Sequence, residues 1–187
     1  MTPAPRFLAA ALMILAACSG RPSLDDPALS SRDLEMERFF SGPLVAHGQF
    51  QDRFGTVRAR FRVDMQGYWD GETLRLEEDF SYDGGRTDRR VWTLRQTGPE
   101  SWQGTAPDVI GTATGQESGD AFNWTYFADL KREDGSTLRA DFDDWMWKLS
   151  DTRLLNRAYV RKYGVTLGEV IIFFEKPDNP TRGRPGK

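Results

Sequence analysis

Apolar side chains return at every second position over long stretches of this chain, which is the pattern of β-strands that bury one face. In residues 57–65 they alternate with polar side chains, three of which are arginines. Residues 74–82 and 122–130 alternate in the same way, with aromatic rings on the apolar face. The pattern predicts strands that turn one face to a core and the other to water.

Short glycine-containing segments separate the alternating stretches and predict tight hairpin turns, because Asp and Gly tolerate positive φ. They are Asp70-Gly71, Asp83-Gly84-Gly85 and Asp134-Gly135. The further strands that we expect lie at residues 90–94, 138–149 and 170–174.

Hairpin follows hairpin with no long helical period between the strands, so we expect an all-β, antiparallel meander. A set of roughly eight to ten such strands fits an up-and-down barrel, which leaves no exposed edge. Long strands and many aromatic residues favour a lipocalin-like β-barrel over a two-sheet sandwich. A short N-terminal helix is expected at residues 33–40, with Ser31 or Asp33 as its N-cap.

The N-terminus has the features of a lipoprotein signal peptide. Residues 1–17 contain one charged side chain, Arg6, and an apolar run that is too short to span a bilayer as a helix. The run ends at Leu15-Ala16-Ala17-Cys18, which resembles the bacterial lipobox. We expect cleavage before Cys18 and acyl chains, palmitate among them, that anchor the protein to a membrane. The alternatives are an ordinary secretory signal or an N-terminal apolar helix, with Cys18 there by chance.

The remaining chain is long enough for one domain with a sizeable core. Residues 18–31, rich in Ser, Pro, Asp and Gly, predict a flexible tether, and residues 177–187 predict a disordered tail. The β-barrel domain is expected at residues 32–176. Because Cys18 is the only cysteine, an intramolecular disulfide and a cysteine-based metal cluster are excluded.

The charge of the mature chain argues against nucleic acid as a partner. The whole chain has a net charge of −3, and loss of Arg6 with the signal makes it −4. Binding to nucleic acid phosphates requires a basic face, which this composition does not favour.

A dense set of polar and aromatic residues lies in the C-terminal half, at Asp143-Asp144-Trp145-Met146, Asn156-Arg157, Lys162-Tyr163-Gly164 and Gly168-Glu169. Their order resembles the bacterial lipoprotein family of domain of unknown function 3833, as do residues 104–111 and 121–126. Asp120 departs from that pattern, in which we expect an asparagine. The resemblance implies a compact, lipocalin-like lipoprotein domain. It brings no established activity and therefore no catalytic residue.

Asp143 and Asp144 are adjacent, so on a regular strand one of them faces the interior. A buried carboxylate needs a partner, and we expect Arg157 to supply it through a bidentate ion pair. Asn156, Glu169 and the neighbouring Trp145 complete the candidate set. Such a network either fixes how the last strands close or anchors the polar end of a ligand.

Glu78 and Arg90 form a second candidate pair. Glu78 lies on the apolar face of its predicted strand, and Arg90 shares a face with Trp92 on the next one. They are expected either as a buried ion pair or as a sign of a polar interior. A register shift of one residue would turn both outward.

Several enzyme classes are disfavoured. His47 is the only histidine, which excludes a histidine-rich metal site, and a Ser-His-Asp triad would depend on it. The chain has no G-x-S-x-G elbow and no P-loop or Rossmann glycine spacing. Neighbouring acids such as Asp143 and Asp144 do not provide the separation across a cleft that glycoside cleavage requires. We expect no cofactor and no metal.

Two functions remain. The first is a non-enzymatic binding module for a lipid or other hydrophobic ligand in the cell envelope, which predicts a cavity in the barrel. The second is a structural or accessory lipoprotein that docks another envelope protein, which predicts a filled barrel and an apolar patch outside. An enzyme that uses inward carboxylates is less favoured. Ser19, in place of an aspartate after Cys18, favours the periplasmic face of the outer membrane over the inner membrane.

Overall fold

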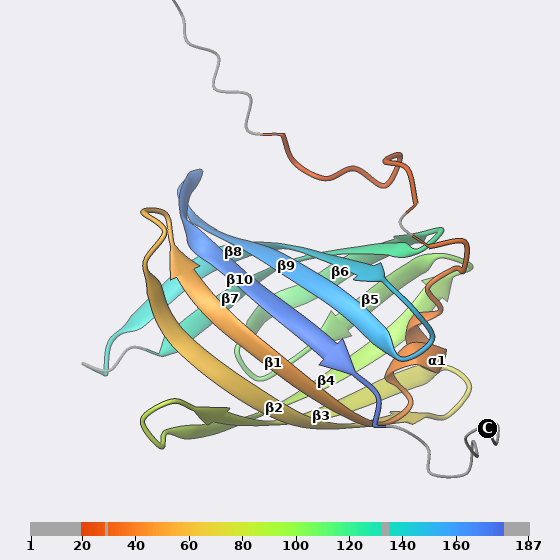
Figure 1. Ribbon diagram of the computed structural model, residues 1–187, viewed down its shortest axis with the longest axis horizontal. Coiled ribbons are helices and arrows are strands. Elements are labelled where there is room, and N and C mark those ends of the chain that lie inside the picture. Colours follow the sequence, from red (N-terminus) through yellow and green to blue (C-terminus); the bar gives the residue numbers. More distant parts are fainter. Residues whose placement is uncertain (1–19, 29, 132–134, 178–187) are drawn as a thin grey trace, which may run out of the picture.

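The computed structural model describes residues 20–28, 30–131 and 135–177, and ten antiparallel strands within them form a closed barrel (Figure 1). Each strand pairs with the next one in the chain, and the first pairs with the last. The predicted antiparallel meander that closes into a barrel is therefore confirmed. The strands are β1 (Gly42–Asp52), β2 (Val57–Trp69), β3 (Thr73–Tyr82), β4 (Thr87–Gly98), β5 (Ser101–Thr105), β6 (Val109–Ser118), β7 (Ala121–Lys131), β8 (Thr137–Lys148), β9 (Arg153–Lys162) and β10 (Val165–Glu175).

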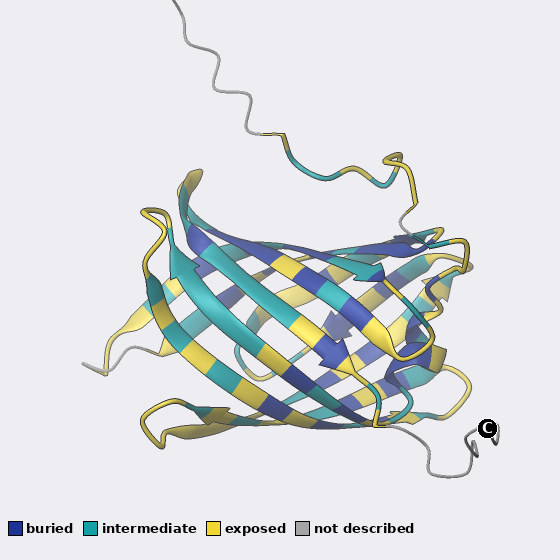
Figure 2. Ribbon diagram, viewed as in Figure 1, coloured by how far each residue is buried: buried dark blue, intermediate teal, exposed yellow. Residues whose placement is uncertain are grey.

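Burial alternates along the strands, as the bands of Figure 2 show. On β3, Leu74, Leu76 and Glu78 are buried, whereas Arg75 between them is exposed. The alternation predicted for this strand has the correct phase. Four strands, β1, β5, β6 and β9, lie where the alternation did not place one.

One short helix, α1 (Met36–Phe40), closes one end of the barrel. Met36, Phe39 and Phe40 are buried, and the Phe40 ring packs edge-on against Phe174 at 5.6 Å. The helix is shorter than the expected 33–40, and Glu35 occupies the N-cap position without a side-chain cap. Its first turn is capped from the barrel instead, because the Glu117 carboxylate accepts the Met36 N–H at 2.9 Å.

The two ends of the barrel differ. The turn between β2 and β3 lies at the end that α1 fills, which we call the plug end (Figure 1). The turns β1–β2, β3–β4 and β9–β10 lie at the opposite end, which we call the mouth.

Residues 20–28 and 30–34, which we call the strap, run along the outside of the barrel and end at Leu34, whose side chain is buried in the core. The Arg21 guanidinium stacks on the Tyr159 ring at 3.8 Å and donates to the Thr166 hydroxyl at 3.4 Å. Further along, the Ser118 hydroxyl donates to the Leu24 carbonyl, and the Ser30 N–H donates to Asp120 at 2.6 Å. The strap thus runs from near the mouth to the plug end.

Some predictions fall outside the described residues: the signal at residues 1–17, the lipidation site Cys18, Asp134 of a predicted turn, and residues 178–187 of the tail. Within the described ranges, no helix is long and apolar enough to cross a membrane.

Candidate ligand site inside the barrel

A cavity of about 60 Å³ lies inside the barrel. Its wall is mostly apolar and includes three methionines, Met36, Met65 and Met146. Ligand pockets typically measure about 300–1,000 Å³, so this cavity as it stands holds only water-sized molecules. Its polar lining residues are Glu78, Arg90, Tyr126, Asp144 and Asn156.

Glu78 and Arg90 form an ion pair on the cavity wall. They lie directly opposite each other on β3 and β4, and the Arg90 Nε donates to the Glu78 carboxylate at 2.7 Å. A second carboxylate, Asp108, lies 3.6 Å from the same guanidinium. The face of Trp92 flanks Arg90 at 5.3 Å. Arg90 is therefore already neutralised by protein carboxylates.

Asp144 and Asn156 form the second polar pair, on β8 and β9. The two residues are 7% and 1% exposed, and the Asn156 amide donates to the Asp144 carboxylate and to the Trp145 carbonyl. Burial raises the pKa of Asp144 to about 7, although Asn156 and the charge of Arg90 oppose this shift. Asp144 thus titrates in the neutral range while facing a cavity.

Tyr126 places a hydroxyl near these groups. Its ring stacks on Phe142 at 4.8 Å and packs edge-on against Trp92 at 5.3 Å. Burial, together with the charge of Asp144, raises the pKa of Tyr126 well above its ordinary value. The hydroxyl therefore stays protonated and remains able to donate a hydrogen bond.

The other candidate residues face outward. Asp143 accepts hydrogen bonds from Asn123 at 3.0 Å and from the Trp145 indole at 2.8 Å. Arg157 pairs with Glu169 at 2.6 Å, and its side chain is 45% exposed.

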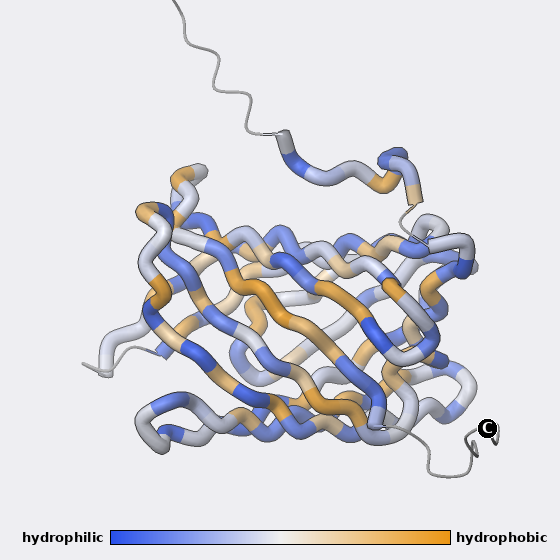
Figure 3. Tube along the Cα trace, in the orientation of Figure 1, coloured by the Kyte–Doolittle hydropathy of each residue, from blue (hydrophilic) through white to orange (hydrophobic). Residues whose placement is uncertain are grey.

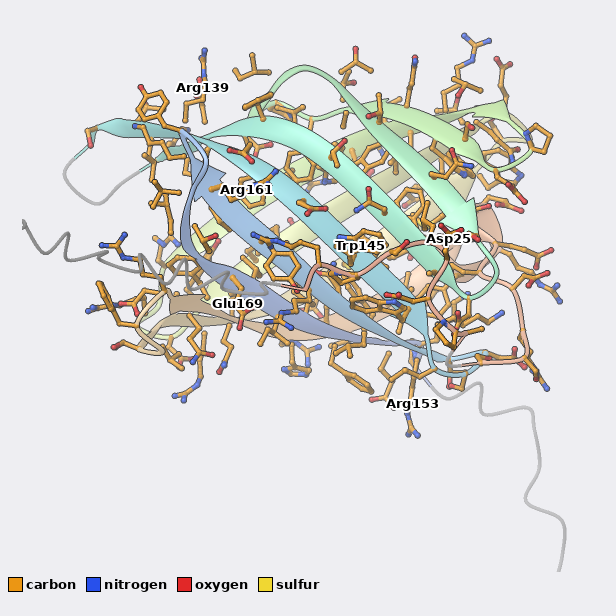
Figure 4. The ribbon with its side chains drawn as sticks, turned by 90° about the horizontal axis from the view of Figure 1, so that it is seen from above. Asp25, Arg139, Trp145, Arg153, Arg161 and Glu169 are labelled. Atoms are coloured by element: carbon orange, nitrogen blue, oxygen red, sulfur yellow. The ribbon has the colours of Figure 1, made fainter. Side chains whose placement is uncertain are left out.

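The expected ion pair between Asp144 and Arg157 is wrong. Trp145 lies opposite Arg157 in the sheet, and Asp144 lies opposite Ala158. Because side chains alternate across a strand, Arg157 shares the outer face with Trp145 and cannot reach the interior. Figure 4 shows Trp145 on the same outer side as the strap segment that carries Asp25.

Two groups were missed as candidates. Tyr126 belongs to the predicted aromatic stripe, but the pattern cannot distinguish a cavity-lining ring from a core ring. Glu117 is a buried acid at the plug end, and burial raises its pKa to about 7. The segment around Glu117 is rich in Gly and Thr, so its sequence shows no apolar alternation that would predict a strand with Glu117 facing inward.

In the described part of the chain, no three His, Cys, Asp or Glu side chains gather to hold a metal ion.

Among solved structures, the barrel is similar to the S-type phycobiliprotein lyase CPES from Guillardia theta, with a TM-score of 0.55 and 9% sequence identity. The similarity covers 76% of this chain and 91% of that one. At this identity the likeness concerns the fold alone, and it agrees with the expected lipocalin-like barrel. No curated protein matches this chain.

A protein-family model matches nearly the whole chain. The model of a family described as protein of unknown function (DUF3833) matches residues 12–176, a range that includes the strap, α1 and every strand of the barrel. This chain is therefore a member of the DUF3833 family.

Proposed function

We propose that the protein is a lipid-anchored binding module that takes a small amphiphilic molecule into its barrel. The observation that carries the proposal is the Asp144 carboxyl group, which is buried, titrates near neutrality and lines a cavity with mostly apolar walls. A buried carboxyl is costly unless it finds hydrogen-bond donors. Asn156 supplies one such donor, and a ligand supplies another.

The charges around the cavity define the polar end of the ligand. Among the described residues that line it, Arg90 is the one cation, and Glu78 and Asp108 already neutralise it. A ligand carboxylate would therefore meet excess negative charge without a free cation. A hydroxyl or an amine meets Asp144 favourably, because each can donate to its carboxylate. The proposed ligand is thus an amphiphilic alcohol or amine rather than a fatty acid.

Three methionine side chains can move to make the cavity large enough for a ligand. Met36, Met65 and Met146 are unbranched and line the cavity. Such side chains change rotamer at low cost and adapt to irregular shapes. The ligand enlarges the cavity by displacing them.

The location is the cell envelope, with a lipid on Cys18 as the anchor. The lipobox supports this assignment, and Ser19 favours the periplasmic face of the outer membrane. The intact mass of the protein purified from membranes tests it, because acylation adds a defined mass to the chain.

Native mass spectrometry of the full lipidated chain tests binding. Solvent extraction releases a non-covalent ligand but leaves the acyl chains on Cys18 attached. We expect a co-purifying amphiphile that Asp144→Leu abolishes and Arg157→Ala, a change on the outer face, retains. A wild-type protein that carries no ligand and takes up none from an envelope lipid extract contradicts the proposal.

The alternative function, docking of another envelope protein, is supported by two observations. The cavity is small, and an apolar stripe lies on the outside of β9 and β10, where Leu155 pairs with Phe173, which is 36% exposed. Figure 3 shows β10 as a run of hydrophobic residues, of which Phe173 is one that is exposed. Replacement of Phe173 by a photo-crosslinking amino acid in cells tests it. A single crosslinked envelope protein would favour the alternative.

A further inference from the structure

Apolar side chains project into solvent at one sector of the mouth. Phe54, in the β1–β2 turn, is 77% exposed, and Tyr163 and Val165, around the β9–β10 turn, are 92% and 51% exposed. The two turns are neighbours, because the Arg53 N–H donates to the Leu167 carbonyl at 2.9 Å. We call Phe54, Tyr163 and Val165 the apolar rim.

Tyr163 is exposed at a conformational cost. Its φ is +52°, and it is the one non-glycine residue of the described ranges in the left-handed region. Bulky side chains rarely adopt this conformation, which glycine or asparagine adopts in most hairpin turns. An aromatic ring held in a strained turn and left in water points to a contact outside the barrel.

Basic groups accompany the rings of the apolar rim. The Arg53 guanidinium lies 4.7 Å from the Phe54 ring centroid, and the Lys162 ammonium lies 5.3 Å from that of Tyr163. Aromatic rings beside cations suit the interface of a bilayer with anionic lipids, where rings insert at the headgroup level and cations meet phosphates.

The N-terminal end of the strap lies close to the apolar rim. Arg21 bonds to Thr166, which follows Val165 of the apolar rim. Cys18 precedes Arg21 by three residues, so at most about 11 Å of chain separates their Cα atoms. A lipid on Cys18 would therefore enter the bilayer close to the apolar rim.

We propose that the apolar rim docks on the surface of the membrane that holds the Cys18 lipid, so that the mouth of the barrel faces the bilayer. The proposal rests on the lipidation that the proposed function includes. The strap fixes the distance to the anchor, and Phe54, Tyr163 and Val165 insert beside the headgroups.

The test uses the full lipidated chain in unilamellar vesicles that contain anionic lipid. Because the lipid blocks Cys18, Phe54→Cys introduces a single free thiol, which is labelled with an environment-sensitive fluorophore. Glu72→Cys, in an exposed turn at the plug end, is the matched control. We expect blue-shifted emission and quenching by lipid-attached nitroxides at position 54, with neither effect at position 72. Added Tyr163→Ser should reduce the quenching at position 54.

Three outcomes overturn the inference. An aqueous spectrum at position 54 in a lipidated, vesicle-bound protein refutes rim docking and leaves the anchor in place. Equal quenching at positions 54 and 72 refutes the orientation. A mass that lacks acyl chains refutes the anchor, and rim docking falls with it.

Discussion

The Asp144 carboxyl group lies inside the barrel, where its charged form is poorly solvated. Burial raises its pKa from 3.8 to about 7, and Glu117 at the plug end is raised in the same direction. Both acids therefore hold their protons in the folded protein at pH values where the unfolded chain has lost them.

The pH dependence of stability follows from this shift. Between pH 3.8 and about 7 the unfolded chain binds fewer protons at Asp144, so the free energy of unfolding falls as pH rises and levels off above that range. At about 1.36 kcal/mol per pKa unit, the loss from Asp144 is on the order of 4 kcal/mol. Asp144→Asn should remove the contribution of Asp144 and leave the contribution of Glu117, so the fall should become roughly half as large, as urea unfolding on either side of the range would measure.

The exposed Asp79→Asn is the control for this experiment and should leave the pH profile unchanged. An Asp144→Asn profile as steep as that of the wild type would show that Asp144 is not the buried titrating group.

The two ion pairs of the candidate set should differ sharply in their contribution to stability. Arg90→Met leaves Glu78 buried without its partner, which should cost about 3–5 kcal/mol. Arg157→Met breaks an exposed pair with Glu169 and should cost at most about 1 kcal/mol. Chemical denaturation of both variants measures the difference, and equal losses would contradict the placement of Arg90 inside the barrel.

The sequence predicted part of the site. Alternation placed Glu78 on an inward face, because the phase of a strand follows from its apolar residues, and it required that either Asp143 or Asp144 face inward. It could not identify Asn156 as the partner of Asp144, because the register between β8 and β9 depends on a turn whose geometry the pattern does not define. Tyr126 was not identified either, because alternation gives the same pattern for an aromatic ring that lines a cavity and for one that packs in the core.

At the scale of the strand, inward-facing glycines explain why the sequence pattern did not predict β1 and β6. Gly48 and Gly115 face inward on β1 and β6, where a Cβ would lie 2.6 Å from the Phe61 ring and 2.3 Å from the Trp124 ring. The neighbouring aromatic side chain fills the space above each glycine. Alternation within one strand cannot reveal such cross-strand complementarity, so β1 and β6 gave no clear signal.

Gly115→Val should therefore overpack the barrel. The added methyl groups meet the Trp124 and Phe122 rings, and we expect a loss of about 1–3 kcal/mol in the free energy of unfolding. Thr112→Val, at another exposed position on β6, should change it by less than about 0.5 kcal/mol. Thermal and urea unfolding of the pair measure both effects, and a neutral Gly115→Val would contradict the packing.

In residues 20–28 of the strap, the clearest contact with the barrel is the stacking of Arg21 on Tyr159. Tyr159→Ala should remove about 0.5–2 kcal/mol of this attachment and raise amide hydrogen exchange in residues 20–28 by roughly 2- to 30-fold. Tyr68→Ala, at a 52% exposed tyrosine on β2, is the control. Unchanged exchange in the strap after Tyr159→Ala would contradict its docking.

At the scale of the whole molecule, the barrel has a closed plug end, a mouth with exposed apolar turns, and a cavity that carries two carboxyl groups and one guanidinium. Closure through β1 and β10 was predictable, because successive hairpins without free edges lead to a barrel. The size of the cavity could not be predicted from the sequence, because it depends on how the inward side chains pack against one another.

The most direct test of the binding proposal is calorimetric titration of the full chain with three ligands that share one tail: hexylamine, hexanol and hexanoate. We predict that the amine and the alcohol bind, that hexanoate does not, and that Asp144→Leu abolishes binding. Hexylamine should bind more tightly as pH rises through about 7, because Asp144 then ionises. Preferred binding of hexanoate, or binding that Asp144→Leu leaves unchanged, would contradict the account.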